Sequence, residues 1–336
     1  MKPKIVKFLQ FTALLFIGIG LLYLAFRTID INEVIEKIRH AKYSWVALFV
    51  VIAILTLIFR ALRWQTLIEP LDEKSSIINI FHAINIGYLA NFAFPRIGEI
   101  TRCGILNRTD NLPADKLFGT VVVERCFDLL MAALMLCLLL VLRFDVFIGF
   151  ITGQLNELQT NSSENSFLQT INIGFWLMIF AMLVVIALVI IFLFGKRLIK
   201  IPVFRKIKNF FAGILQGIKS VRRLRKVKLF ILLNILVYLM YLLQTYVMFF
   251  ALETTSSLSL IDALFVLVLS SFALIIPVQG GIGSYHLIIS TGLTVFGLTM
   301  DDGMAYALIS HSTTSLLFII LGAASLIFAF YGKRKA

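Results

Sequence analysis

The sequence predicts an all-α polytopic membrane protein with about eight membrane segments. Hydrophobic residues make up 60% of the 336 residues, charged residues only 15%, and the mean hydropathy is +0.96. Several apolar runs reach the roughly 20 residues that a helix needs to span a bilayer. A soluble protein cannot bury so many apolar side chains, so we expect a single transmembrane domain over residues 1–336.

The positive charge of the chain is concentrated in three clusters. Residues 1–7, 196–228 and 333–335 hold 18 of the 31 Lys and Arg residues, and elsewhere acidic residues are in the majority. Such clusters mark cytoplasmic ends by the positive-inside rule. Both termini are therefore predicted to be cytoplasmic, in the cell (inner or cytoplasmic) membrane. The clusters suit anionic lipid headgroups, and their confinement argues against nucleic-acid binding.

The first part of the chain predicts three helices. Residues 5–26 form a spanning helix, and residues 27–43 form a short amphipathic helix on the outer surface. Residues 44–62 form a spanning helix that returns inward. Near the end of the third, Arg60 and Arg63 are expected to reach lipid headgroups, with Trp64 in the aromatic belt of the membrane interface.

The next apolar run, residues 76–94, is interrupted by Pro95 and Gly98. Basic residues lie on both sides of this region, so both flanks are predicted to be cytoplasmic. A segment that begins and ends on one side is not a simple span, and we expect a broken or re-entrant hairpin. Irregular backbone at membrane depth is tolerated only where it is buried or lines a cavity. Two closely packed spanning segments are the alternative.

Ionisable residues are concentrated between residues 91 and 128, although the surrounding sequence is apolar. They are Arg96, Glu99, Arg102, Glu124, Arg125 and Asp128. Glu124 and Asp128 share one face of a predicted spanning helix, residues 117–142. Glu99 and Arg102 are three residues apart and are expected to pair on a helix that Pro95 starts. An ionisable group at mid-membrane costs roughly 2.5–3.5 kcal/mol. These groups therefore form either an ion network that only holds helices together or a polar site inside the membrane, and we favour the site.

The rest of the chain predicts a polar outer loop, a helix that returns inward, a basic amphipathic helix on the inner leaflet and further apolar runs. The outer loop is assigned to residues 143–170, the helix that returns inward to 171–194 and the basic amphipathic helix to 196–228. The further apolar runs are 229–252, 260–277, 287–296 and 304–331, with a small acidic loop at Asp301 and Asp302. The outer loop divides the domain into a first half, residues 1–142, and a second half, residues 171–336.

The two halves contain similar breaks. The sequence IIPVQGGIGSYH interrupts an apolar run in the second half, as NFAFPRIGE does in the first. Paired short segments broken by Gly or Pro in corresponding halves point to the binding site of a transporter. Their helix ends offer N–H groups to anions such as phosphate. Gly280, Gly281 and Gly283 allow a ligand close to the backbone, although glycines also pack membrane helices tightly.

The order NFAFPRIGEITR, VVVERCFD and PVQGGIGSYH resembles the transmembrane domain of lysylphosphatidylglycerol synthases, a flippase-like family that also occurs as stand-alone membrane proteins. The resemblance covers nearly the whole chain. It implies two hairpin-like broken segments around a polar cavity, in a domain implicated in moving lipids or lipid-linked headgroups between leaflets. The positions predicted to bind substrate are Asn91, Pro95, Arg96, Glu99, Arg102, Glu124, Arg125, Asp128, Gln279, Gly280, Gly281, Gly283 and His286.

Two departures from the family pattern affect the expected activity. The second motif of the family commonly contains PGGxG followed by an acid, whereas Gln279 stands here in place of the proline and His286 near the position of the acid. The site therefore differs in charge, because histidine is neutral or charged near neutral pH. The related synthases carry a soluble aminoacyl-transferase domain after the membrane region, and this chain ends soon after its last predicted helix. We therefore do not expect an enzyme, and no catalytic residue is assigned.

The leading prediction is lipid translocation, with Arg96, Arg102 and Arg125 holding phosphate. Glu99, Glu124 and Asp128 are expected either to pair with these arginines when the site is empty or to bind a cationic group of the headgroup. The alternatives are an integral-membrane enzyme acting on a lipid-linked substrate and a non-catalytic membrane partner of a lipid-modifying or envelope-assembly system. The sequence contains no Walker motif and no Cys or His spacing typical of a metal site, so no cofactor or metal is predicted. The expected partners are membrane lipids with anionic headgroups, and a homo-oligomer or a membrane partner stays open.

Overall fold

The computed structural model describes residues 3–27, 29–71, 75–160, 224–273 and 275–331, which form helices joined by turns. Eleven α-helices lie in these ranges. The chain divides into two compact units, residues 1–143 with 221–336 and residues 144–220. Helix α7 (Phe144–Thr160) is the described part of the second unit, and the helices below belong to the first.

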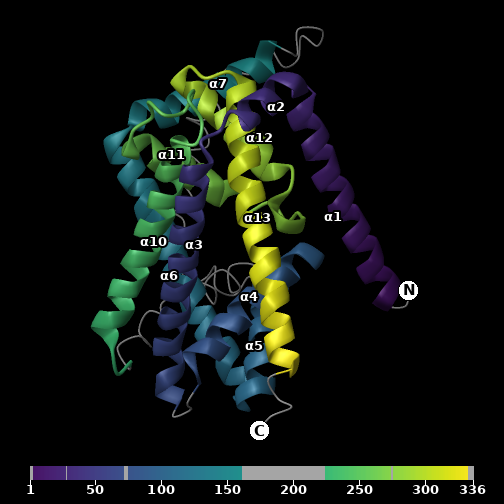
Figure 1. Cartoon of the computed structure of the whole chain (residues 1–336), viewed down its shortest axis with the longest axis vertical. Helices are drawn as coiled ribbons and strands as arrows, with labels where there is room; N and C mark the ends of the chain where they lie inside the picture. Colours follow the sequence, from purple (N-terminus) through teal and green to yellow (C-terminus); the bar gives the residue numbers. More distant parts are fainter. Residues whose placement is uncertain (1–2, 28, 72–74, 161–223, 274, 332–336) are drawn as a thin grey trace, which may run out of the picture. The chain divides into compact units, whose positions relative to one another are not determined.

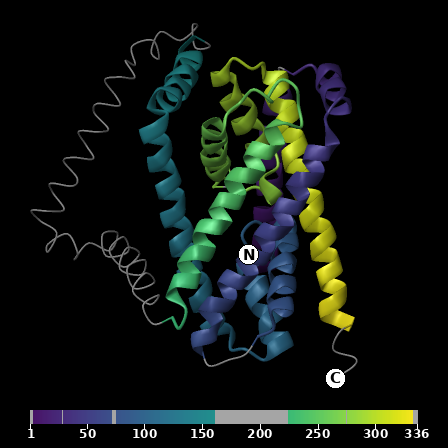
Figure 2. The ribbon, with the colours of Figure 1, turned by 60° about the vertical axis from the view of Figure 1, so that its left-hand side comes forward.

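Four helices of the described part are long and apolar enough to cross a membrane. They are α3 (Tyr43–Ile68), α6 (Ala114–Leu142), α10 (Val227–Phe249) and α13 (Met300–Tyr331). Figures 1 and 2 show α3, α10 and α13 running along the length of the first unit. The predicted helices at these four places are confirmed with shifted ends, and α1 (Pro3–Phe26) lies where the first helix was expected.

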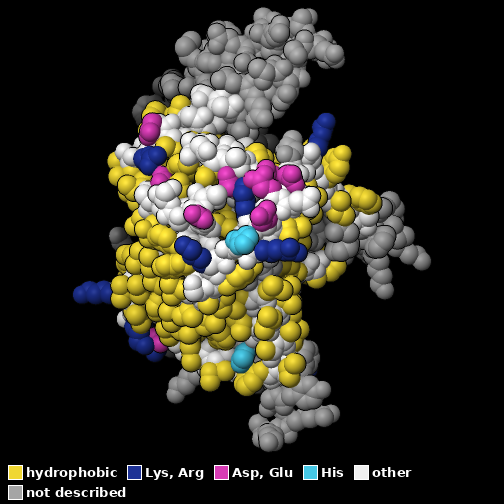
Figure 3. All heavy atoms as spheres, turned by 45° about the horizontal axis from the view of Figure 1, so that its top comes forward, with side chains coloured by type: hydrophobic (Ala, Val, Ile, Leu, Met, Phe, Trp, Pro, Cys, Tyr) yellow, Lys and Arg dark blue, Asp and Glu magenta, His cyan; other side chains and the backbone are white. Residues whose placement is uncertain are grey.

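The short amphipathic helix predicted over residues 27–43 is α2 (Ile31–Arg39). Asp30 caps it, because its carboxylate accepts hydrogen bonds from the N–H groups of the first turn, as N-cap residues do. Lys37 then joins α2 to the start of α13 through an ion pair of 2.8 Å with Asp302. In Figure 3, charged side chains gather at the end that carries α2, and hydrophobic side chains cover the flank in view.

Helices α4 (Ile77–Ala93) and α5 (Gly98–Asp110) form a close pair around the break at Pro95. Residue 94 is extended, as expected for a residue before proline. A Cβ on Gly98 would lie 2.3 Å from the carbonyl oxygen of Gly87 on α4, so only glycine fits there. The Asn91 side-chain oxygen accepts a hydrogen bond of 2.8 Å from the Gly98 N–H. This glycine contact holds the two helices together.

A second helix pair comes from the other half of the chain. It consists of α11 (Leu260–Ala273), the short 3-10 turn Gln279–Gly281 and α12 (Ser284–Leu293). Gly283 has φ +85°, and a Cβ there would lie 2.4 Å from the carbonyl oxygen of Gly18 on α1. The glycines of this motif therefore allow both a sharp turn and close packing.

The two pairs lie at opposite ends of the first unit, and their breaks face each other. Figures 1 and 2 show α4 and α5 near the end where α13 finishes, and α11 and α12 near the end where it begins. The Arg96 guanidinium donates a hydrogen bond of 2.8 Å to the Ile275 carbonyl oxygen. A Cβ on Gly280 would lie 2.7 Å from the Phe92 ring. The breaks of the two halves are thus in direct contact.

Several expectations from the sequence are wrong in detail. Pro95 does not start α5, which begins at Gly98 after a turn. The first part of the predicted loop 143–170 is helical, as α7. Asp301 and Asp302 lie in the first turn of α13, not in a loop, where they complement the helix dipole. The predicted elements at 171–194 and over most of 196–228 lie outside the described residues.

Candidate polar site

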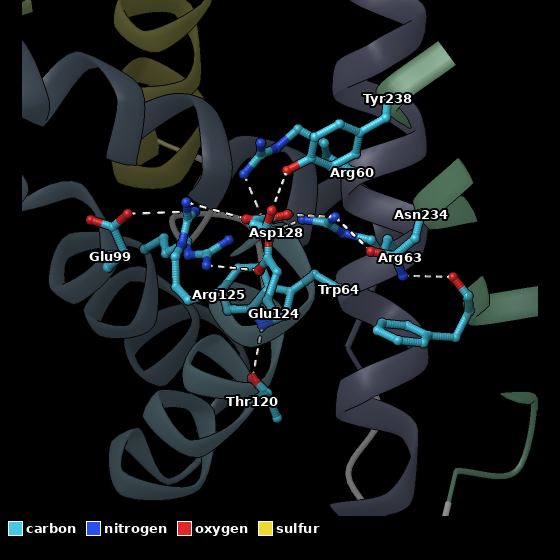
Figure 4. A network of polar contacts seen from close by, with 12 residues as sticks. Arg60, Arg63, Trp64, Glu99, Thr120, Glu124, Arg125, Asp128, Asn234 and Tyr238 are labelled. Carbon is cyan, nitrogen blue, oxygen red and sulfur yellow. Dashed lines mark hydrogen bonds and ion pairs between the residues drawn. The ribbon is translucent and has the colours of Figure 1, made fainter. Parts of the chain in front are cut away.

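A buried carboxylate, Glu124 on α6, is the centre of a charged network (Figure 4). One of its oxygens, Oε1, lies 2.6 Å from Arg63 Nη2 and 3.3 Å from Arg60 Nη2. The other, Oε2, lies 2.7 Å from Arg102 Nη2. All four side chains are buried. Removing such charges from water is costly unless they are paired and hydrogen-bonded, and three guanidinium groups around one carboxylate provide that pairing.

Asp128, one helical turn beyond Glu124, extends the network. Its Oδ1 accepts a hydrogen bond of 2.8 Å from Arg63 Nη1, which also donates to the Asn234 side-chain oxygen at 2.9 Å. The Tyr238 hydroxyl donates to the backbone carbonyl of Asp128 at 2.8 Å. Since Asn234 and Tyr238 lie on α10, the network joins α3, α6 and α10.

Aromatic side chains surround the arginines. The Arg102 guanidinium lies 4.4 Å from the Trp64 ring centroid, a cation–π contact. The Trp64 indole N–H donates to Thr120 Oγ1 at 2.9 Å. Arg60 Nη1 donates to the Tyr241 hydroxyl at 2.7 Å. Together these contacts fix the rings and cations between α3, α5, α6 and α10.

The outer edge of the network is held more loosely. Arg125 Nη2 lies 3.4 Å from Glu99 Oε1, and its Nη1 lies 3.3 Å from Asp128 Oδ2. These distances exceed the 2.6 and 2.7 Å ion pairs of Glu124 with Arg63 and Arg102, and the Arg125 side chain is 46% exposed. Long, partly exposed ion pairs contribute little to stability, so Arg125 has contacts that a ligand can replace.

The predicted residues thus divide between two places. Glu99, Arg102, Glu124, Arg125 and Asp128 meet in the network, whereas Asn91 lies in the last turn of α4, and Pro95 and Arg96 lie in the turn between α4 and α5. Arg96 adopts φ +64°, which is uncommon for a residue other than glycine. Its guanidinium donates to the backbone of the opposite break, and its expected role as a phosphate ligand stays a prediction.

Residues of the second motif are placed around two histidines, the buried His286 and the half-buried His311. Gln279 and Gly281 are buried in the turn before α12. His286 Nδ1 accepts from the Gly283 N–H at 3.3 Å, and the rings of His286 and His311 have centroids 4.8 Å apart. The His311 Nε2–H donates to the Gly280 carbonyl at 2.8 Å, because a carbonyl oxygen only accepts. This cluster supports the second break.

Two interpretations of the charged residues are wrong. Glu99 and Arg102 do not pair with each other, since Arg102 reaches Glu124 and Glu99 reaches Arg125. Arg60 and Arg63 do not extend to headgroups, because both point into the network. Trp64 is fully buried rather than at the interface.

The network also contains residues that the sequence did not identify as a site: Arg60, Arg63, Trp64, Thr120, Asn234, Tyr238 and Tyr241. A signal for some of them exists, because Asn234, Tyr238 and Tyr241 give an otherwise apolar helix a polar side. Within the described residues, no group of three or more His, Cys, Asp or Glu side chains is arranged to hold a metal ion.

Comparison with known proteins identifies the family. The lysylphosphatidylglycerol synthase TM region family matches residues 10–322. The chain belongs to this family. It is therefore a multi-pass membrane protein. The expected resemblance is confirmed over nearly the whole chain.

Two curated relatives match different extents of the chain. A UPF0104 membrane protein of Methanocaldococcus jannaschii is 24% identical over 344 residues, which cover 96% of this chain and 95% of that protein. The glycosyltransferase AglD of Haloferax volcanii is 29% identical over 133 residues, 39% of this chain and 21% of that protein. No solved structure matches the chain.

Proposed function

We propose that this protein moves membrane lipids, or lipid-linked headgroups, between the leaflets of the cell membrane. The observation that carries the proposal is the charged network inside a domain of membrane-spanning helices. Groups such as Arg60, Arg63, Arg102 and Glu124 are expensive within a membrane and are typically found along the pathway of a polar substrate.

The helix pairs α4–α5 and α11–α12 supply the architecture for this function. Their helices have 17, 13, 14 and 10 residues, fewer than the roughly 20 that a span requires. We therefore assign them as two re-entrant hairpins that enter the membrane from opposite sides. With the spanning helices they make about eight membrane segments, and the positive-inside rule places both termini in the cytoplasm.

In this account the polar headgroup passes through the protein while the acyl chains stay in the bilayer. The network provides polar contacts for the headgroup at depth. The contact between the two hairpin tips, where Arg96 binds the Ile275 carbonyl, separates the two sides of the membrane. Movement of one tip away from the other exposes the network first to one leaflet and then to the other, as in transporters built from broken helices.

Leaflet exchange of fluorescent lipids in proteoliposomes tests the proposal. Phosphatidylglycerol, lysylphosphatidylglycerol, phosphatidylethanolamine and a polyprenyl-linked sugar are compared, with protein-free vesicles as the baseline. We expect exchange of at least one class well above the baseline. Absence of exchange of every lipid by folded, reconstituted protein would contradict translocation. Chemical conversion of a lipid, detected by chromatography of the same vesicles, would instead establish an enzyme.

A further inference from the structure

The charged network has one positive charge in excess within the described part of the chain. Four arginines, Arg60, Arg63, Arg102 and Arg125, are paired with the three carboxylates Glu99, Glu124 and Asp128. Three of these arginines are buried and Arg125 is 46% exposed, so the excess charge is partly removed from water, and a charge without a counterion is then costly in a membrane protein. An anion at the network would remove that cost, whereas a cation would increase it.

The network also has hydrogen-bond donors in excess. The Nε–H groups of Arg60, Arg63 and Arg102 are buried and have no hydrogen-bond acceptor among the described residues. Buried polar groups nearly always have a partner, and these three residues are at most 7% exposed. The excess positive charge indicates an anionic ligand. The buried N–H donors without an acceptor indicate that this ligand has several acceptor oxygens.

The carboxylates offer little to a cationic headgroup. Both oxygens of Glu124 are engaged by arginines, and so are both oxygens of Asp128. Two buried carboxylate oxygens have no hydrogen bond in the described region, Glu99 Oε2 and Glu124 Oε2. Glu124 Oε2 is occupied by its 2.7 Å ion pair with Arg102, which leaves Glu99 Oε2. An ammonium group would meet this one oxygen and four guanidinium groups.

From these observations, and resting on the proposed function, we propose that the network binds the phosphate of an anionic headgroup through Arg125 and Arg60, and discriminates against aminoacylated, cationic headgroups. Arg125 is the arginine with the exposed side chain and the long ion pairs. Arg60 has the longest of the ion pairs to Glu124, at 3.3 Å. A guanidinium binds phosphate through two parallel hydrogen bonds, so Arg125 gains shorter contacts by turning to the ligand. Arg60 keeps its 2.7 Å hydrogen bond to the Tyr241 hydroxyl and offers the ligand its Nε–H, which has no acceptor among the described residues.

Two substitutions change the charge balance in opposite directions. Arg125→Gln removes the excess charge and one phosphate donor, and we expect it to weaken binding of an anionic lipid about tenfold, since each charge-assisted hydrogen bond contributes on the order of one decade in affinity. Glu99→Gln raises the excess charge and frees Arg125, and we expect it to tighten binding. A purely structural role of these residues does not predict a tighter complex. Arg39→Gln, on the exposed surface of α2, removes the same charge outside the network and is the matched control.

The test measures binding of dioctanoyl-phosphatidylglycerol and dioctanoyl-lysylphosphatidylglycerol to the purified full chain in non-ionic detergent by calorimetry. We expect the anionic lipid to bind at least tenfold more tightly than the lysyl lipid. Competition by glycerol phosphate would show that the phosphate alone is sufficient, and lipid binding without such competition would assign the site to the complete headgroup. Either result supports the anion site.

Tighter binding of the lysyl lipid, or equal effects of Arg125→Gln and Arg39→Gln, would overturn the inference. If Arg125→Gln does not fold, Glu99→Gln decides the question alone, and unchanged or weaker binding contradicts the inference. Exchange of lysylphosphatidylglycerol alone in proteoliposomes would retain the proposed function and reject this specificity. Selective binding of phosphatidylglycerol without any exchange would retain the specificity and reject translocation.

Discussion

Replacing Arg63 by methionine tests whether the network holds the membrane helices together. Arg63 contacts Glu124 at 2.6 Å, Asp128 at 2.8 Å and Asn234 at 2.9 Å, and its side chain is fully buried. Without it, Glu124 keeps two arginines, but Asp128 keeps only its 3.3 Å ion pair with Arg125. The substitution removes two charge-assisted hydrogen bonds to carboxylates, each of which contributes about 1.5–3 kcal/mol. The expected loss of stability is therefore roughly 3–5 kcal/mol, the range found when one partner of a buried ion pair is removed.

The expected loss is measurable as a change in thermal stability in detergent. A change of 1 kcal/mol shifts the Tm of a large domain by about 2–4 °C, so Arg63→Met should lower the Tm by roughly 10 °C, while Arg39→Met should leave it nearly unchanged. Combining Arg63→Met with Glu124→Met should cost less than the sum of the two single changes, because both single changes remove the same Arg63–Glu124 ion pair. Equal Tm values for Arg63→Met and Arg39→Met would refute the assignment of Arg63 to a tight ion network.

Three further substitutions test other parts of the structure by the same thermal assay. Gly98→Ala should destabilise the protein strongly, because its Cβ would lie 2.3 Å from a backbone oxygen of α4. The control Gly104→Ala, on the same helix, meets nothing within 4 Å and should be neutral or slightly stabilising. Similar effects of the two changes would contradict the close helix contact. Trp64→Phe removes the hydrogen bond to the α6 hydroxyl and should cost at least about 1 kcal/mol, so an unchanged Tm would count against that bond. Lys37→Met should lower the Tm equally at pH 7 and pH 9. Burial lowers the pKa of Lys37, but its hydrogen bonds and ion pairs with carboxylates raise it above 10.5 overall. The stabilisation by Lys37 is therefore present at pH 7 and at pH 9 and is lost only as the pH rises beyond the raised pKa. A Tm difference between the unmodified protein and Lys37→Met that disappears by pH 9 would contradict the ion pair.

Both breaks and most of the described helices, though not α7, were predictable from local sequence, because they depend on the length of apolar runs and on Pro and Gly. The run that became α6 and the interruptions at Pro95 and near Gly280 are examples. The shared face of Glu124 and Asp128 was also predictable, since it follows from helical spacing alone. Both residues contact Arg63 from that face.

The partners of the charged residues were not predictable in the same way. Arg60 and Arg63 lie near the end of an apolar run, and this position is the same for a side chain that reaches headgroups and for one that points inward. The choice depends on where α5, α6 and α10 pack against α3, which local spacing does not encode. For the same reason Arg102 pairs with Glu124 on another helix and not with Glu99 on its own.

The most direct test of the central claim is the rate of leaflet exchange of fluorescent phosphatidylglycerol in proteoliposomes that contain equal amounts of folded Arg125→Gln or Arg39→Gln protein. The account predicts that Arg39→Gln exchanges this lipid at the rate of the unmodified protein, and that Arg125→Gln is slower by about tenfold. Equal rates for the two variants, or no exchange by the unmodified protein, would contradict the claim that the buried network is the site through which lipid headgroups cross the membrane.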